Sequence, residues 1–126
     1  MASGLTLDAG AFIAAEKRDR LFYAMWKEAL DRRAPIIVPA AVLAQVWRGN
    51  SPTIARLLPS CSIVDLDEPT AKKIGVLLAK AGRSDVVDAA VVVGAAARGD
   101  AIVTSDRADI APLVAALGVE LRIVDV

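Results

Sequence analysis

The sequence contains no histidine, one cysteine and few aromatic residues, and each of these features excludes something. Without histidine, Ser-His-Asp and Cys-His catalysis, histidine acid–base chemistry and zinc sites with imidazole ligands are excluded. The single cysteine, Cys61, excludes an internal disulfide and a cysteine-only metal cluster, and it is typical of a reducing compartment. Aromatic residues make up 4% of the chain, so the core is expected to consist of alanine, valine, leucine and isoleucine.

Net charge and long apolar runs are also absent. Fifteen basic and fifteen acidic residues give a formal net charge of zero, so overall attraction to a polyanion is not expected. The longest uncharged stretch, residues 34–47, has 14 residues and two prolines, which is too short and too broken to span a bilayer. Residues 1–7 lack the basic segment and apolar run of a targeting peptide. We therefore expect a cytoplasmic protein without a membrane partner.

The charges are unevenly distributed along the chain. Residues 1–56 hold eight basic and five acidic residues, whereas residues 57–126 hold seven and ten. Two predicted helices carry a group of basic residues: Lys17, Arg18, Arg20, Lys27, Arg32 and Arg33. These residues either pair with neighbouring acids on a solvated helix face or form a patch that contacts phosphates.

The pattern of the chain predicts one α/β domain over residues 1–126. A length of 126 residues fits one domain, and a hydrophobic content of 56% is typical of a globular protein. Short apolar runs alternate with longer helical patterns, which predicts a parallel sheet covered on both faces. The predicted strands are residues 5–7, 36–38, 62–66, 101–104 and 121–126. The predicted helices are residues 9–16, 21–32, 39–47, 51–58, 69–81 and 107–117.

Residues 84–98 fit either a strand or a helix. Three consecutive valines, 91–93, favour a strand, but the length of the segment favours a helix. Ser84 is a suitable N-cap, Asp85 suits the positive end of a helix dipole, and Gly99 suits the position after the last turn. The segment is apolar on nearly every side, which predicts a buried helix with Asp88 inside it.

Carboxylates are the main side chains left that could act in catalysis or bind a metal. The sequence has neither of the glycine-rich phosphate-binding loops of nucleotide-binding folds. Asp8 directly follows the first predicted strand and Asp106 follows the fourth, so both are expected at the sheet edge where ligands bind. Asp88 lies one helical turn after Asp85 on the same face. Several carboxylates at one edge would repel each other, and a divalent cation such as Mg²⁺ or Mn²⁺ would relieve this repulsion.

Each of these acids also has a structural explanation. Asp8 could form an Asx turn or cap a helix, Asp106 could cap the helix that follows it, and Asp85 could be a capping charge. Asp88 is the hardest to explain in this way, because a carboxylate in an apolar helix is costly without compensation.

Four runs of the sequence, taken in order, resemble those of PIN-domain proteins, and in particular the VapC-like ribonuclease toxins of toxin–antitoxin pairs. They are LTLDA (residues 5–9), PAAVLAQVWRG (39–49), DVVDA (85–89) and VTSD (103–106). The resemblance covers essentially the whole chain. It implies a three-layer α/β/α sandwich with a parallel sheet of four to five strands. It also implies metal-dependent hydrolysis of phosphodiester bonds in RNA, a VapB-like antitoxin as partner, and a homodimer.

The same resemblance implies roles for individual residues. Asp8, Asp88 and Asp106 would be the catalytic acids that hold Mg²⁺ or Mn²⁺. Thr104 and Ser105 match the polar positions beside the last acid, where a hydroxyl could bind phosphate or a water on the metal.

Asp85 and Gln45 would lie beyond the metal ligands or contact substrate. Asp109 is a further candidate for a supporting acid, although an ordinary charge on the helix surface explains it equally well.

The sequence departs from the family pattern at two positions. Gln45 stands where the family has glutamate, so one full charge is lost and metal affinity should fall. Gly10 follows Asp8 and Ala9 where a small hydroxyl residue is common. Glu16 does not replace the missing acid, because it lies about 12 Å along the helix from Asp8. It is expected either to pair with Arg20 or to support the site from beyond the metal ligands.

Three functions therefore remain open. The first is a ribonuclease slowed by Gln45, and the second is a PIN-like module that binds RNA or an antitoxin without cleavage. The third is a small α/β interaction protein whose acids are only caps and turns.

Overall fold

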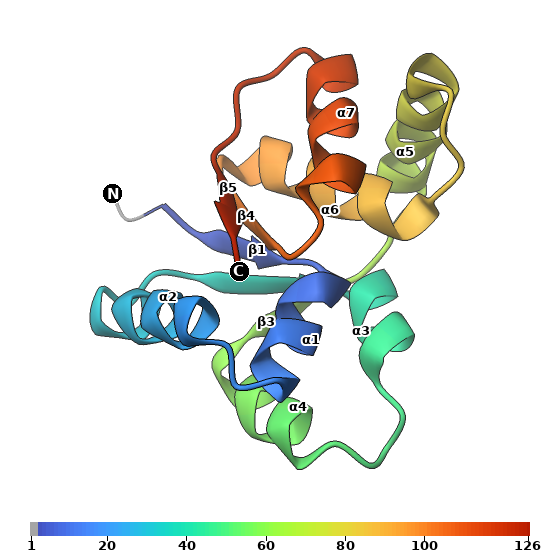
Figure 1. Cartoon of the computed structure of the whole chain (residues 1–126). Coiled ribbons are helices and arrows are strands. Elements are labelled where there is room, and N and C mark those ends of the chain that lie inside the picture. The colour runs from blue at the N-terminus through green and yellow to red at the C-terminus, as the bar shows by residue number, and fades with distance from the viewer. Residues whose placement is uncertain (1–2) are drawn as a thin grey trace.

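Five parallel strands form one sheet in the order β3-β2-β1-β4-β5 (Figure 1). The computed structural model describes residues 3–126. The strands are β1 (Leu5–Leu7), β2 (Ile36–Pro39), β3 (Ser62–Val64), β4 (Ala101–Thr104) and β5 (Ile123–Asp125). The predicted α/β class and the parallel sheet are confirmed.

Helices cover both faces of this sheet. Helices α5, α6 and α7 lie on one side, and α1, α2 and α4 lie on the other (Figure 1). The helices on the first side are α5 (Glu68–Ala81), α6 (Val86–Arg98) and α7 (Arg107–Leu117). The remaining helices are α1 (Ala9–Glu16), α2 (Arg20–Asp31), α3 (Ala40–Val46) and α4 (Pro52–Leu57), which a 3₁₀ turn (Leu58–Ser60) extends.

The order of the strands reverses direction at the centre of the sheet. From β1 the chain continues to β2 and β3 on one side, and then crosses over to β4 and β5 on the other. Leu7 at the end of β1 pairs with Val103 in β4, and the Asp8 N–H donates to the Val103 carbonyl at 3.2 Å. In open parallel sheets, ligands bind outside the carboxyl ends of the strands at such a reversal. The chain therefore places the residues after β1 and β4 at the expected ligand-binding edge.

The predicted starts of α2, α3, α4 and α5 and the predicted N-cap of α6 are each wrong by one residue, and the differences at α3 and α6 have a clear physical cause. Pro39 belongs to β2, where it pairs with Val64, and its ψ of 138° is extended, so α3 begins at Ala40. The N-cap of α6 is Asp85 and not Ser84, because the Asp85 side chain accepts the Asp88 N–H at 2.9 Å. A carboxylate of this kind satisfies an N–H that has no partner within the helix.

The outer strands are shorter than predicted. Strand β3 ends at Val64 and β5 covers only Ile123–Asp125, whereas α7 occupies the predicted residues 107–117. Both short strands lie at an edge of the sheet, and Ile63 and Val64 of β3 are exposed. The apolar pattern therefore overestimated the length of the two edge strands, which have a neighbouring strand on one side only.

The core is largely aliphatic, as the composition predicts. Helix α6 contributes a buried run from Ala89 to Val93 together with Ala95. Its ends are exposed, so the prediction of a helix buried throughout is wrong outside the middle turns. Within residues 3–126, no helix combines the length and the apolar character needed to cross a membrane. The largest fully buried side chains include Phe12, Phe22, Leu7, Ile54, Ile102 and Ile110.

A buried polar group lies at the opposite end of the sheet from the expected site. Asp100, which immediately precedes β4, accepts hydrogen bonds from the Thr6 hydroxyl at 2.8 Å and from Arg98 Nε at 2.9 Å. Arg98 also donates to Thr6 at 3.0 Å. This acid is fully satisfied by its neighbours, so we assign it to the fold and not to chemistry.

Some of the basic residues in and beside α2 pair with neighbouring acids, as expected for a helix face exposed to solvent. Lys27 pairs with Asp31 at 2.8 Å and Arg32 pairs with Glu28 at 3.3 Å, each four residues apart on α2. The expected contact of Glu16 with Arg20 is not made. Instead, Glu16 accepts a hydrogen bond from Ser51 at 2.8 Å.

Candidate active site

Asp8 lies at the point where β1 ends and α1 begins. Its side chain is 4% exposed, and Oδ1 accepts the Ala11 N–H at 2.9 Å, so Asp8 does cap α1. Burial raises the pKa of Asp8, and the negative charge of Asp106 raises it further. Hydrogen bonds from the Thr104 hydroxyl and from backbone N–H groups act in the opposite direction. Asp8 is thus both a cap and a member of an acidic group.

Thr104 connects the first and the last acid. This residue ends β4 and is completely buried. Its Oγ1 accepts the Asp106 N–H at 2.9 Å, and its hydroxyl lies near enough to Asp8 to lower the pKa of that acid. Because Thr104 is buried next to both acids, it supports them and is shielded from substrate. Ser105, the next residue, is exposed.

Asp106 has an exposed carboxylate at the start of α7. It occupies the N-cap position, but its side chain makes no capping hydrogen bond, so the cap explanation does not account for this residue. The Asp109 side chain contacts Asp106, and this contact raises the pKa of Asp109. Asp109 therefore lies with the other acids. The sequence alone did not decide between this position and an ordinary charge on the helix surface.

Asp88 lies in the first turn of α6 and is partly buried. Burial is the largest cause that raises its pKa from an ordinary 3.8 to about 6. The negative charges of Asp85, Asp109, Asp8 and Asp106 raise it further, in that order. The four carboxylates come from three different segments, so the fold brings the predicted acids close enough to repel one another.

Asp85 acts as a helix cap, as one explanation predicted. Its exposed side chain accepts the Asp88 N–H and so holds the first turn of α6. It still adds negative charge beside Asp88.

The chemistry of this group fits a divalent cation. Its donors are oxygen atoms, and no salt bridge found in residues 3–126 includes Asp8, Asp88 or Asp106. As they are placed, no three acid, cysteine or histidine side chains in the described chain lie close enough to hold one ion. The carboxylate of Asp106 is exposed and makes no capping hydrogen bond.

Gln45 lies on α3 with an exposed side chain. Helix α3 packs against α1 and α6, the helices that Asp8 and Asp85 cap. Gln45 makes no side-chain hydrogen bond to an acid within the described residues. Its role therefore stays a prediction from the sequence.

Gly10 allows α1 to approach the loop after β4. A Cβ atom at this position would collide with the Ser105 side chain and would lie 3.0 Å from the Ser105 nitrogen and 3.2 Å from Asp8 Oδ1. A larger side chain would not fit here without rearrangement.

We expect Gly10→Ala to lower the free energy of unfolding by about 1–3 kcal/mol, because it overpacks this contact. Gly75→Ala is a matched control, since Gly75 also lies in a helix and a Cβ there would meet open space. The control should stabilise the protein by about 0.5–1 kcal/mol. Thermal denaturation of both variants tests this prediction, and a Gly10→Ala variant that melts at or above the wild type contradicts it.

The pKa of Asp88 also predicts how stability depends on pH. The folded state holds this proton up to a pH of about 6, whereas the unfolded chain loses it near 3.8. Ionisation of Asp88 therefore opposes folding: this penalty is absent below about pH 3.8, grows as the pH rises, and is complete above about pH 6.

Asp88→Asn should consequently stabilise the metal-free protein at pH 7.5. We expect about 1–2 kcal/mol, which allows for the partial exposure of the side chain. The gain should disappear near pH 4. Denaturant unfolding at both pH values, with a chelator present, measures the difference, and an equal gain at both values contradicts the assignment.

Comparisons with known proteins agree with the fold. The model of the PIN domain family matches residues 5–111. Among solved structures, the chain is similar to a DNA-bound VapBC from Salmonella typhimurium, with a TM-score of 0.73 and 16% identity over 98% of both chains. A VapBC2 from Rickettsia felis, bound to a fragment of its promoter DNA, has a TM-score of 0.73 and 18% identity over 97% of this chain and 98% of that one.

PAE2754 from Pyrobaculum aerophilum is also similar, with a TM-score of 0.64 and 17% identity over 94% of this chain and 98% of that one. A comparison with curated proteins finds no match. At these identities the solved structures show only a shared fold. The family model matches most of the chain and therefore shows the family as well. The chain belongs to the PIN domain family.

Proposed function

We propose that this protein is a metal-dependent endoribonuclease and the toxin of a toxin–antitoxin pair. The observation that carries the proposal is that Asp8 and Asp106 follow the carboxyl ends of β1 and β4, with Asp88 near enough for their charges to raise its pKa. No salt bridge found in residues 3–126 offsets these charges. The third hypothesis, in which the acids are only caps and turns, explains Asp8 and Asp85 but not Asp88 or Asp106.

In this proposal Asp8, Asp88 and Asp106 hold one Mg²⁺ or Mn²⁺. When bound, such an ion polarises a phosphate oxygen and makes water a stronger nucleophile at neutral pH. The chain itself contributes the arrangement of these acids. The Ala11 N–H and the Thr104 hydroxyl orient Asp8, and Thr104 also fixes the backbone of Asp106. Ser105 is exposed beside them, and in this proposal its hydroxyl contacts substrate phosphate.

The test is cleavage of single-stranded RNA at fixed salt, with Mn²⁺ or Mg²⁺ titrated and a chelator as control. We expect cleavage that requires the metal. A folded protein that binds RNA but does not cut it at saturating metal would overturn the proposal and support the alternative, a non-catalytic module. Gln45 is the observation that favours this alternative.

The two VapBC neighbours are complexes bound to DNA. By similarity, we propose that this chain pairs with a VapB-like antitoxin in the cytoplasm. A small reading frame directly upstream that encodes a DNA-binding protein would support the pairing. The protein from that frame should bind the chain and suppress its cleavage of RNA, and failure to bind would contradict the pairing.

We also propose that the protein forms a homodimer. Trp26 is buried in the core of its own chain, as are Phe22, Ala29 and Val42, so these residues do not need a partner. Leu21, at 62% exposure, and Trp47, at 43%, remain uncovered. Light scattering at micromolar concentration should give twice the 13.2 kDa of one chain, and a mass near 13.2 kDa contradicts the proposal.

A further inference from the structure

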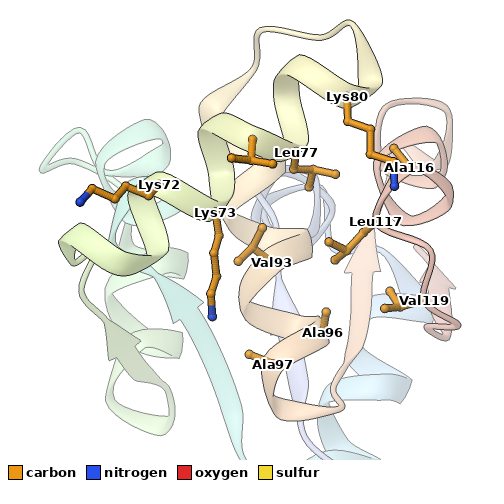
Figure 2. A pocket seen from close by; sticks show the side chains of 11 residues that line it. Lys72, Lys73, Leu77, Lys80, Val93, Ala96, Ala97, Ala116, Leu117 and Val119 are labelled. Carbon is orange, nitrogen blue, oxygen red and sulfur yellow. The ribbon is translucent and has the colours of Figure 1, made fainter.

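An apolar groove of about 600 Å³ lies between α5, α6 and α7 (Figure 2). Val76 and Leu77 of α5, Val93 and Ala97 of α6, and Leu117 of α7 line it. Val76 is 70% exposed, the highest value among the large exposed apolar side chains of residues 3–126. Apolar surface of this kind commonly marks an interaction site.

The charged residues that line this groove are all lysines: Lys72, Lys73 and Lys80. Lys72 pairs with Glu68 at 2.8 Å, and in Figure 2 its side chain points away from the groove. Lys73 extends along the groove beside Val93, and Lys80 extends toward α7 (Figure 2). No salt bridge found in the described part of the chain includes either of these two lysines.

The spacing of these residues indicates an elongated occupant. Lys73, Val76, Leu77 and Lys80 follow the i, i+3, i+4, i+7 pattern of one helix face. The two lysines are therefore about 10.5 Å apart along the axis of α5, too far for one small anion to contact both. A helix with two acidic residues seven positions apart has the same spacing and can place one of them opposite each lysine.

We propose that this groove docks an amphipathic helix of a partner protein, with its apolar side chains on the groove floor and its acidic side chains opposite Lys73 and Lys80. Val93, the groove residue of α6 closest to Asp88 in sequence, lies about 7.5 Å along the helix from it. None of the candidate acids lines the groove, so the groove is separate from the candidate active site. The inference therefore does not depend on the proposed ribonuclease activity.

A designed peptide tests the chemistry of the groove directly. The probe is a fluorescein-labelled helical peptide of about 16 residues, with leucines at i, i+3, i+4 and i+7 positions and flanking glutamates seven positions apart. In the matched peptide, lysines replace the glutamates. Fluorescence anisotropy with the whole protein should give at least about tenfold tighter binding of the acidic peptide, and binding should weaken as salt rises.

Protein variants then locate the binding. Lys73→Gln/Lys80→Gln should weaken binding of the acidic peptide by about fivefold or more. Lys17→Gln/Lys27→Gln removes the same charge outside the groove and should change binding by less than about twofold. Val76→Asp should abolish binding without unfolding the protein, because Val76 is mostly exposed.

Other results would overturn the proposal. Equal binding of the two peptides, or no effect of Lys73→Gln/Lys80→Gln, excludes acidic docking at this groove. If the double variant weakens single-stranded RNA binding in chelator but leaves peptide binding unchanged, the groove is a nucleic-acid site. If Val76→Asp lowers the mass measured by light scattering, the groove is an interface between copies of the chain.

Discussion

Asp88→Asn is expected to reduce RNA cleavage by at least about 100-fold. Asparagine keeps the size of the side chain but removes the charge that a divalent cation would require, and the loss of about 3 kcal/mol of metal or transition-state stabilisation gives a factor of this size. The backbone N–H that Asp85 accepts is unchanged, so α6 should still begin at the same residue. Asp8→Asn should have the same effect on cleavage.

Loss of activity in this variant should not come from unfolding. The ionised carboxylate opposes folding at neutral pH, so Asp88→Asn should melt at a higher temperature than the metal-free wild type. Mn²⁺ should raise the melting temperature of the wild type and have little effect on the variant, which gives a readout independent of cleavage.

Asp67→Asn is the matched control for Asp88→Asn. Asp67 accepts the Thr70 N–H at 2.9 Å at the start of α5, and asparagine is also an effective cap. Its cleavage rate should equal that of the wild type. If Asp88→Asn keeps more than about a tenth of the wild-type rate, Asp88 is not required for the reaction.

Gln45→Glu is expected to increase cleavage about tenfold to 100-fold. The substitution restores the negative charge that the family pattern has at this position, and a charged ligand is worth a few kcal/mol in a site of this kind, where each 1.4 kcal/mol is about tenfold. The Gln45 side chain is exposed, so the change should leave the fold intact. Mn²⁺ titration by calorimetry should show tighter binding in parallel with the faster cleavage.

If Gln45→Glu does not increase cleavage, Gln45→Ala distinguishes between two explanations. Equal activity in the wild type and Gln45→Glu, with less activity in Gln45→Ala, would show that the amide oxygen is already an adequate ligand. Equal activity in all three proteins would show that α3 contributes nothing to the site at this position. Inactivity in all three, with RNA still bound, would support the non-catalytic module.

The sequence by itself determined the class of the fold and indicated the candidate acids. Alternating short apolar runs and longer helical patterns predicted the parallel sheet, because β-type runs and helices bury apolar residues with different periods. The absence of histidine, together with one cysteine, left the carboxylates after the first and fourth strands as candidates. The bounds of α7 were also predicted, because Gly118 ends it in a left-handed conformation with a φ of 75°.

Tertiary structure alone decided which acids pair with a basic residue and which lie without one among other acids. Asp100 and Asp8 both adjoin a strand and both are buried, but Asp100 pairs with Arg98, and Asp8 lies among other acids. The sequence also did not predict that Thr104 would be buried between Asp8 and Asp106, or that Asp109 would contact Asp106. These differences arise from contacts between segments far apart in the chain, which local periodicity and spacing do not encode.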